Sequence, residues 1–487
     1  MTAQPAASSA RRFLESPIVV VFAICAGFAI VRMATVPGDG DIFWQRWLGS
    51  VILATREVPR ALGDEVTSAV GSPWVAHEWL FSVAYAWLQM HGLGVIAVVG
   101  LAACVMGVLI LTALRTLDLG ASITSTIAAM VITTLTMMSG LGIRVQIVSW
   151  LFVTIFLKLL PQKRVRWILI ILTVVWANLH ASVVIAPIII GAYGVGRTLD
   201  HRREGLPLAL LTILTAAATL ATPFGYVLPT YAFSILSNSL IHQLTTEWQA
   251  PSVWALLIGL LCIIPIALIP RDRIGSGERL VVLLLFLMMA DAVRNMPLFF
   301  IGAAPLAAAA LPFRSRVLVA ESANAVAFGL FVSVGTFVTI LLTVHAFGKA
   351  SAPLPTFAAQ YITNLPDTRV FCNDFAWCGM VVGHPGVRVF LDGRADPFPR
   401  SVWADYKTIR FESTWNSALR RNGLNTVLVA RTDGLTRRLS TSALWVRVYS
   451  DRYYEVYRSA MCQRKLWTTP EQWSVDRVGR KLPSQLR

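Results

Sequence analysis

The chain has 487 residues, of which 56% are hydrophobic and only 14% are charged. An average soluble domain carries about 25% charged residues, so this composition predicts a protein embedded in a lipid bilayer. The formal net charge of +16 would suit a nucleic-acid partner, but much of the Lys and Arg lies in short segments between apolar runs. Basic residues in such segments set the orientation of membrane helices, so we expect no nucleic-acid partner.

Apolar runs of roughly 17 to 25 residues recur through the first 350 positions, and each could cross about 30 Å of hydrocarbon as a helix. We count about eleven such spans. The first, residues 17–36, follows Arg11 and Arg12 and ends without a small-residue cleavage site. We therefore interpret it as an uncleaved helix and not as a signal peptide.

Basic residues alternate between successive connections, as expected for a membrane protein with a cytoplasmic N-terminus. The predicted inner connections are rich in Lys and Arg and comprise residues 115–118, 158–166, 197–204, 271–279 and 314–316. The predicted outer connections contain few basic residues and comprise residues 38–76, 141–146, 178–182, 223–252 and 291–297. After a last span near residues 325–346, an odd number of helices places the tail outside the cytoplasm.

The tail differs in character from the rest of the chain, so we predict two domains. Residues 1–347 form a transmembrane domain whose first outer loop is 37–76, and residues 348–487 form a soluble extracytoplasmic α/β domain. Short segments rich in β-branched and aromatic residues predict strands at 368–371, 387–391, 426–430 and 445–449, with a helix within 403–422. The tail is basic, which suits contact with anionic lipid headgroups or phosphate, and simple solvated charge is the alternative.

Three cysteines lie in the tail, where an oxidising compartment would allow one disulfide. We predict a bond between Cys372 and Cys378, which enclose a short segment, with a bond to Cys462 as the alternative.

Polar residues gather in the outer connections, and charged groups near membrane spans are costly enough to raise a functional question. Asp39 and Asp41 are separated by one glycine, so one could act as a base while the other positions it or shifts its pKa. A plain Asp-Gly turn that caps the following helix is the alternative. His77 and Glu78 precede an apolar run beside two tryptophans, which also suits simple interfacial anchoring.

Two of the outer connections place an arginine close to an amide, an arrangement that suits binding of a phosphate. The pairs are Arg144 with Gln146 and Arg294 with Asn295, although Arg294 could instead pair with Asp291 three residues earlier. His180 could bind a metal, but no second histidine lies at helical spacing from it, so we expect no metal site.

These residues resemble motifs of the GT-C superfamily of membrane glycosyltransferases, in particular bacterial enzymes that use polyprenyl-phosphate sugars. The resemblance covers most of the chain and departs at Gln45, where the group commonly has histidine. It is carried by Asp39-Gly40-Asp41-Ile42-Phe43-Trp44, Pro73-Trp74, His77-Glu78-Trp79-Leu80, Arg144-Val145-Gln146, Trp176-Ala177-Asn178-Leu179-His180, Thr246-Glu247-Trp248 and, in the tail, Val389-Phe390-Leu391-Asp392-Gly393-Arg394-Ala395-Asp396.

The resemblance implies a GT-C-like polytopic α-helical fold in a bacterial plasma membrane and transfer of a hexose or pentose from a polyprenyl-phosphate donor to a lipid or glycan hydroxyl of the cell envelope. No cofactor is implied, and metal dependence varies within the superfamily. The acidic residue of the first outer loop carries over to Asp39 or Asp41, and we prefer Asp41 as the catalytic base. The expected substrate-binding residues are His77, Glu78, Arg144, Gln146, His180, Glu247, Arg294 and Asn295.

Two other classes of function fit parts of the sequence. A transporter or lipid flippase would also place charged residues near the membrane, but transporters often have internal repeats and broken helices. Neither feature is clear here, and the polar residues lie on one side. A non-catalytic lipid-binding scaffold is suggested by Gln45 and by the basic tail.

Overall fold

The computed structural model describes residues 17–35, 40–236, 239–310, 353–462, 473–475 and 481–483. The chain forms two compact units, one of residues Met1–Ala61 with Ser72–Ala352 and one of residues Leu62–Gly71 with Pro353–Arg487. The sequence predicted a boundary near residue 348 and assigned the whole first outer loop to the transmembrane domain. In the structure, ten residues of that loop group with the tail. The predicted span at 325–346 lies outside the described residues.

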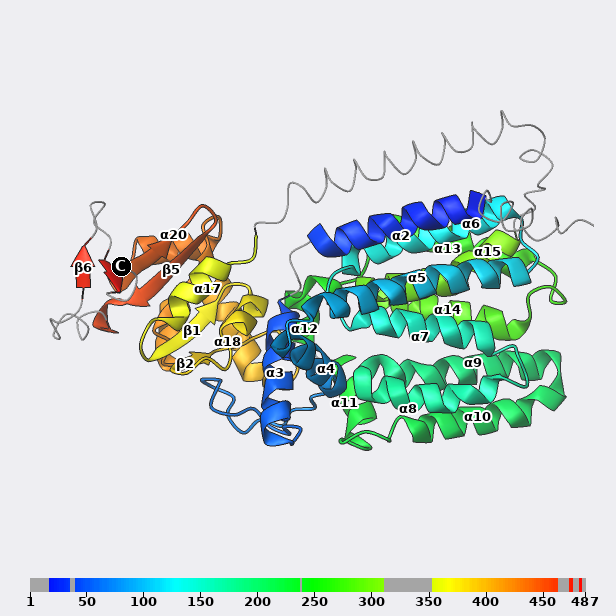
Figure 1. Cartoon of the computed structure of the whole chain (residues 1–487), viewed down its shortest axis with the longest axis horizontal. Coiled ribbons are helices and arrows are strands. Elements are labelled where there is room, and N and C mark those ends of the chain that lie inside the picture. The colour runs from blue at the N-terminus through cyan, green and yellow to red at the C-terminus, as the bar shows by residue number, and fades with distance from the viewer. Residues whose placement is uncertain are drawn as a thin grey trace, which may run out of the picture. The chain divides into compact units, whose positions relative to one another are not determined.

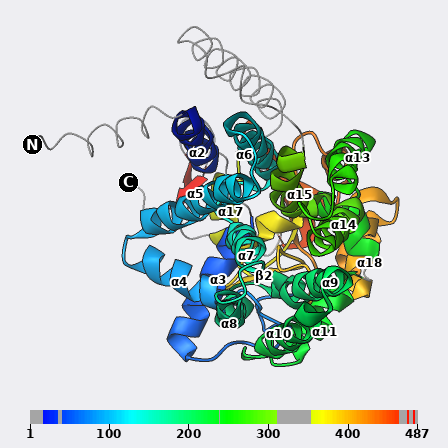
Figure 2. The same ribbon diagram turned by 90° about the vertical axis from the view of Figure 1, so that its right-hand side faces the viewer.

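The first unit is a bundle of apolar helices whose axes run roughly side by side, as Figures 1 and 2 show. Three described helical segments have both the length and the hydropathy to cross a bilayer, namely Gly94–Asp118, Ala181–Asp200 and Val293–Ala310. Five shorter helices of 10–17 residues are also strongly apolar. Many large apolar side chains point outward from these helices, for example Val95, Ile171 and Leu261, each more than 60% exposed. The chain is therefore a multi-pass membrane protein.

The helices of the bundle follow the predicted apolar runs along the chain. They are α2 (Pro17–Thr35), α5 (Gly94–Asp118), α6 (Ile123–Met137), α7 (Gln146–Leu159), α8 (Leu169–Leu179), α9 (Ile185–Asp200), α10 (Gly205–Ala218), α13 (Val253–Leu268), α14 (Ser276–Asp291) and α15 (Met296–Ala310). Short 3₁₀ segments adjoin several of them, including η3 (Ala181–Val184), η5 (Thr246–Trp248) and η6 (Val293–Asn295).

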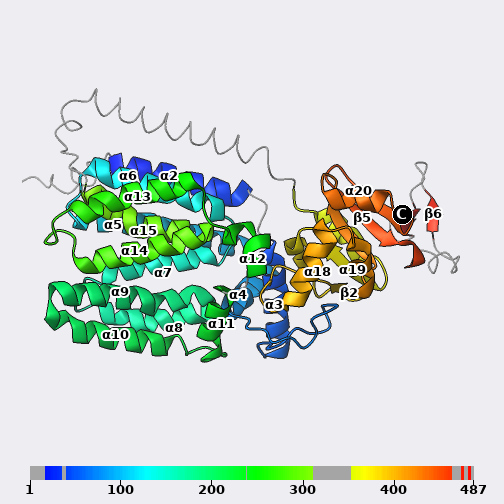
Figure 3. The same cartoon turned by 180° about the vertical axis from the view of Figure 1, so that it is seen from behind.

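Four further helices gather at one end of this bundle, as Figures 1 and 3 both show. They are α3 (Asp41–Thr55), α4 (Trp79–Met90), α11 (Val227–Leu236) and α12 (Ser239–Leu244), and all belong to, or directly follow, predicted outer connections. Helices α3 and α4 approach closely at Gly49, where a Cβ atom would lie 1.9 Å from the carbonyl oxygen of Ser82. Only glycine tolerates that separation, so Gly49 sets the distance between the two helices.

The contacts described next join predicted inner connections to one another and predicted outer connections to one another. Among the predicted inner connections, Lys158 pairs with Asp118, and Arg166 pairs with Glu204 at 3.1 Å. Among the outer connections, Arg144 pairs with Glu247, and the backbone N–H of Val293 donates to the carbonyl of Gln249. The two sets therefore lie at opposite ends of the bundle.

The second unit contains a mixed five-stranded sheet in the order β2-β1-β3-β5-β4. Strands β1, β2 and β3 are parallel. Strand β5 runs antiparallel to both of its neighbours, β3 and β4. Four strands match the predicted segments, whereas β5 was not predicted, and the predicted helix is two helices. The elements are α17 (Thr356–Thr363), β1 (Thr368–Cys372), η8 (Phe375–Met380), β2 (Val387–Val389), α18 (Arg400–Phe411), α19 (Trp415–Arg421), β3 (Thr426–Ala430), α20 (Gly434–Ser440), β4 (Trp445–Ser450) and β5 (Tyr454–Ser459), followed by a small pair, β6 (Trp473–Val475) and β7 (Lys481–Pro483).

Residues from the first outer loop extend this sheet beyond β2. Val66 forms a parallel bridge with Val389, whose backbone N–H donates to the carbonyl of Glu65 at 2.8 Å. The guanidinium of Arg394 is fully buried and pairs with Glu65 and Asp392, each at 2.7 Å. A buried cation requires such partners, so the loop segment and the tail are held together by both a backbone pairing and a charge cluster.

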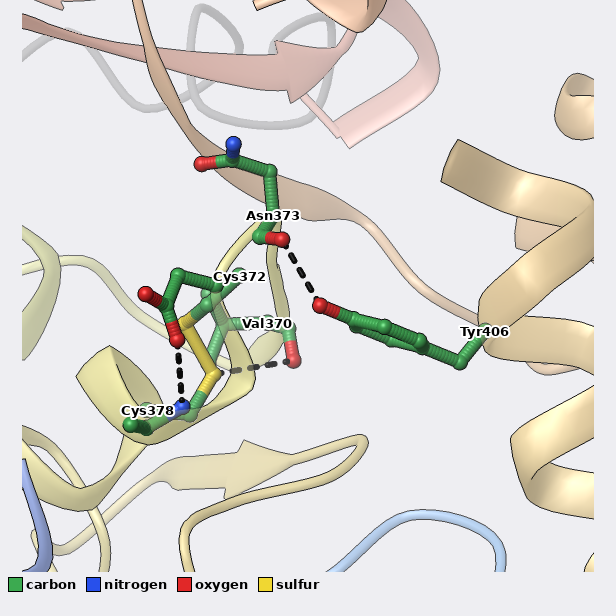
Figure 4. Close-up of a disulfide and its surroundings, with 7 residues drawn as sticks. Val370, Cys372, Asn373, Cys378 and Tyr406 are labelled. Carbon is green, nitrogen blue, oxygen red and sulfur yellow. Dashed lines mark hydrogen bonds between the residues drawn. A yellow bond between two sulfur atoms is a disulfide. The ribbon is translucent and has the colours of Figure 1, made fainter. Parts of the chain in front are cut away.

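The predicted disulfide between Cys372 and Cys378 is present, with the two Cα atoms 5.8 Å apart, and Cys462 is a free thiol. Figure 4 shows the bond at the end of β1, beside the hydroxyl of Tyr406, which donates to the carbonyl of Asn373 at 2.7 Å. The bond connects β1 to η8, which leads toward β2.

Candidate active site

Glu78 is the centre of a polar cluster formed by predicted outer connections of the first unit. Glu78 is only 5% exposed, and its Oε2 atom accepts a hydrogen bond from the side-chain amide of Gln45 on α3. Its Oε1 atom faces Nε2 of His180 at 3.4 Å and Nδ1 of His77 at 3.9 Å. The close crossing at Gly49 brings Gln45, one turn earlier on α3, against Glu78, one turn before Ser82.

His180 ends α8, and two serines hold its ring in place. Its Nδ1 atom lies 2.6 Å from Oγ of Ser182 and 3.1 Å from Oγ of Ser149. Ser149 also accepts hydrogen bonds from Ser182 and from the indole N–H of Trp176, at 2.8 and 3.0 Å. This network fixes the ring so that the other nitrogen, Nε2, points at Glu78.

His77 packs between two rings from other parts of the chain. Its ring centroid lies 5.6 Å from that of His180 and 5.4 Å from that of Tyr231 on α11. Its Nδ1 atom is buried and has no hydrogen-bond partner among the residues that the structure describes. Burial, and to a lesser extent the positive charge of Arg294, lowers the pKa of His77 to about 3. Burial, His77 and Arg294 likewise lower the pKa of His180, so both imidazoles are neutral at neutral pH.

A second group of charged residues adjoins the first. Arg144 pairs with Glu247 at 3.5 Å, and the guanidinium of Arg294 lies 4.4 Å from the ring centroid of Trp248. Burial alone would raise the pKa of Glu247, but the charges of Arg144 and Arg294 outweigh burial and keep that pKa below its usual value. The charge of Arg294 contributes to the pKa shifts of His77, His180 and Glu247, so we treat the two groups as parts of one candidate site.

Asp41 lies one helical turn from this site. It is the first residue of α3 and accepts a hydrogen bond from the indole N–H of Trp44 at 3.0 Å. Gln45 follows it by four residues, so Asp41 and Gln45 share one face of α3. A carboxylate in the first turn of a helix is also favoured by the helix dipole, so a capping role and a chemical role are compatible.

The remaining predicted site residues have different surroundings. The amide of Asn295 donates to the carbonyl of Met288 at 2.9 Å and so caps the end of α14. Gln146 is the half-buried first residue of α7, and Asp291 is exposed. Asp39 lies outside the described residues.

Sequence reasoning missed four contributors to the site. Gln45 was noted only as a departure from a motif, and Ser149, Ser182 and Tyr231 were not singled out. Ser182 lies two residues after His180, and its backbone N–H and hydroxyl both contact the His180 ring. Ser149 and Tyr231 reach the site only through the packing of helices.

No protein-family model matches the chain, and no curated protein is similar to it in sequence. Solved structures do share its fold. An oligosaccharyltransferase from Archaeoglobus fulgidus aligns with a TM-score of 0.57 and 10% identity, over 85% of this chain and 70% of that one. ArnT from Cupriavidus metallidurans, solved with undecaprenyl phosphate, aligns with a TM-score of 0.52 and 14% identity, over 90% of this chain and 97% of that one.

A third structure has the same architecture over a smaller share of its own length. The mycobacterial arabinofuranosyltransferase AftD aligns with a TM-score of 0.50 and 14% identity, over 92% of this chain and 41% of that one. The likeness extends to enzymes from archaea and bacteria and agrees with the motifs that the sequence shares with membrane glycosyltransferases. The chain therefore has the GT-C fold of membrane glycosyltransferases.

Proposed function

We propose that this chain moves a sugar from a polyprenyl-phosphate-linked donor to a hydroxyl group of a lipid or glycan acceptor on the outer face of a bacterial plasma membrane. The GT-C fold supports the class of reaction, and the polar cluster in the outer connections supports its place. ArnT was solved with undecaprenyl phosphate, which supports a donor lipid of the same class.

The surroundings of the Arg294 side chain are the main support for the proposal. Its guanidinium is half-buried and is held over the indole of Trp248, yet no carboxylate among the described residues pairs with it. A guanidinium in this state can bind a phosphate through two parallel hydrogen bonds. Arg144 adds positive charge nearby, although Glu247 neutralises part of it.

The transfer step needs one base and one anion site. Asp41 takes the proton of the acceptor hydroxyl as the oxygen bonds to the anomeric carbon of the sugar. The bond between that carbon and the phosphate oxygen breaks, and its electron pair leaves with the polyprenyl phosphate. Arg294 and Arg144 stabilise the negative charge that develops on this leaving group. A positioned base typically contributes about 10² to 10⁴ in rate.

The orientation is part of the proposal. The alternation of basic connections supports a cytoplasmic N-terminus and an outer site. A disulfide in the tail supports an oxidising compartment for the second unit.

Binding of undecaprenyl phosphate to the purified protein, measured by native mass spectrometry, tests the anion site. We expect Arg294→Ala to weaken binding about 10- to 100-fold, since a hydrogen bond to a charged group contributes about 1.5 to 3 kcal/mol. Arg60→Ala is the matched control, because Arg60 also lies over an aromatic ring, that of Phe224, and contacts none of the site residues named above. Equal binding by the wild type and by Arg294→Ala would remove the main support for the proposal.

Identification of the lipid that co-purifies with the chain separates transfer from the other two functions. A polyprenyl-phosphate sugar that is consumed when acceptor membranes are added indicates a transferase. Movement of the intact lipid between leaflets of a vesicle, without loss of its sugar, would indicate a flippase. Binding with neither outcome would indicate a scaffold.

A further inference from the structure

Three potential metal ligands converge in the candidate site. His77, Glu78 and His180 each offer one ligand atom, and these atoms all lie within 4.8 Å of one another. The first two ligands precede α4 and the third ends α8, so the chain folding brings together residues about 100 positions apart. No second histidine lies at helical spacing from His180 in the sequence. The second histidine of the group, His77, comes from another connection.

The separations suit an intervening ion better than direct hydrogen bonds. Two ligand atoms that each lie about 2.1 Å from a tetrahedral zinc ion are about 3.4 Å apart. His180 Nε2 and Glu78 Oε1 are 3.4 Å apart, and His77 Nδ1 is 3.9 Å from the same oxygen. Charge-assisted hydrogen bonds between nitrogen and a carboxylate are shorter, about 2.7 to 2.9 Å.

The surroundings supply the outer hydrogen bonds that metal ligands usually have. Nδ1 of His180 contacts the hydroxyls of Ser182 and Ser149 and the backbone N–H of Ser182, the last at 3.3 Å, which leaves Nε2 to face the other ligands. Oε2 of Glu78 accepts from Gln45, which leaves Oε1 to face them. The buried Nδ1 of His77 has no hydrogen-bond partner among the described residues, and a buried polar atom without a partner is costly.

We infer that His77, Glu78 and His180 bind one divalent transition-metal cation, and that two histidines with one carboxylate suit zinc. Three protein ligands leave a fourth position open, as in catalytic zinc sites. The sequence alone predicted no metal site, because the ligands that accompany His180 come from another part of the chain.

The charge of the site gives such a cation a role, which rests on the proposed function. The charges of Asp41, Glu78, Glu247, Arg144 and Arg294 sum to −1, so a divalent ion would give these residues a net charge of +1. A phosphate monoester carries about −1.5 to −2 at neutral pH. When bound beside the donor, such an ion would supply positive charge that stabilises the polyprenyl phosphate released by sugar transfer.

Metal content of the purified full-length protein tests the site directly. After treatment with a chelator and dialysis against zinc, mass spectrometry of the elements should find about one zinc ion per chain. His77→Ala and Glu78→Gln should each reduce this to a trace. His91→Ala and Glu57→Gln are matched controls on exposed residues of the same unit and should retain the ion.

Cobalt substitution and thermal stabilisation by zinc test the metal site further. Cobalt should replace zinc and give visible absorption bands that His77→Ala lacks. Added zinc should raise the melting temperature of the wild type and not that of Glu78→Gln, because an ion that binds only the folded state stabilises it. A wild type that binds no zinc, or variants that bind it as the wild type does, would overturn the inference.

The metal site and the proposed function can fail separately. Binding of undecaprenyl phosphate by a protein that holds no metal would leave the function standing and exclude the ion. A stoichiometric ion in a protein that binds no polyprenyl phosphate would support the metal site and exclude the proposed donor.

Discussion

Glu78 owes its setting to the adjacent His77 and to residues from two other segments of the chain, Gln45 on α3 and His180 at the end of α8. Gln45 donates to one carboxylate oxygen, and His180 and His77 face the other. Membrane glycosyltransferases that resemble this chain commonly have histidine where it has Gln45. The structure gives Gln45 a definite task, which is to satisfy and orient Glu78, so glutamine at this position is compatible with a functional site.

The charge of the residue at position 45 should matter more than its size. We expect Gln45→Glu, which has nearly the same shape, to destabilise the protein by about 1 to 3 kcal/mol, because it places a second carboxylate against Glu78 in a buried site. Thermal unfolding of the purified protein measures this. Added zinc should recover part of the loss. Gln45→Glu with wild-type stability both with and without zinc would show that the contact with Glu78 is not formed.

Asp41 is the residue on which the proposed chemistry depends. Asp41→Asn keeps the size of the side chain and an oxygen that can accept from Trp44, but it removes the basic carboxylate. We therefore expect normal folding and donor binding, with transfer reduced about 10²- to 10⁴-fold. Sugar transfer with the true donor is the measurement, and Glu57→Gln is the control on the same face of the bilayer. If Asp41→Asn and Asp39→Asn each transferred at the wild-type rate, the assignment of the base would be wrong.

At the scale of elements, the crossing of α3 and α4 decides whether the site forms. A Cβ atom at position 49 would lie 1.9 Å from a backbone oxygen of Ser82, which cannot rotate away. We expect Gly49→Ala to force the helices apart, to cost about 1 to 3 kcal/mol or more in stability, and to separate Gln45 from Glu78.

Gly49→Ala should therefore have effects similar to loss of the hydrogen bond between Gln45 and Glu78. Thermal unfolding and zinc content of Gly49→Ala give the comparison, and Gly100→Ala is the control, because nothing lies within 4 Å of a Cβ atom at that position of α5. A Gly49→Ala protein as stable as the control would mean that the helices do not cross as closely as described.

The pairing of the first outer loop with the sheet of the second unit is a separate feature at the same scale. Glu65→Ala removes one partner of Arg394 but leaves Asp392 in place, so the sheet should stay folded while residues 62–71 loosen. Hydrogen exchange of the full chain should show faster exchange at Thr67, whose N–H donates to Val389. Glu57→Ala, on an exposed residue of the same loop, should leave that exchange unchanged.

Arg394→Ala should have a larger effect than Glu65→Ala. It leaves two carboxylates without their cation, and breaking a buried pair in this way typically costs about 3 to 5 kcal/mol. Equal stability of the two variants would contradict the assignment of Arg394 as the shared partner.

At the scale of the whole molecule, the contacts between connections divide the connections into two sets at opposite ends of the bundle. The excess of basic residues in one set predicts that it faces the cytoplasm. In a protein with its other free cysteines replaced, we expect a cysteine at exposed Tyr226 to react with a membrane-impermeant reagent in intact cells and one at exposed Asp272 not to react. The reverse pattern would invert the orientation and place the site on the cytoplasmic side.

The sequence by itself determined the membrane class, most of the helices, four strands of the sheet and the disulfide. These features depend on local signals: long apolar runs, alternation of basic connections, short β-branched segments and close cysteines. It also singled out the charged residues proposed for the site, because polar groups beside membrane spans are conspicuous against an apolar background, and their roles stay predictions.

Only the tertiary structure decided which of those residues meet. Asn295 caps a helix, whereas His77 joins His180 across about 100 residues of chain. Glu65 joins Arg394 across 329 positions. Such contacts have no local pattern in the sequence, because they depend on how closely helices and strands pack, as at Gly49. The physical reason is that a side chain binds what lies next to it in space, and packing brings together residues that lie far apart along the chain.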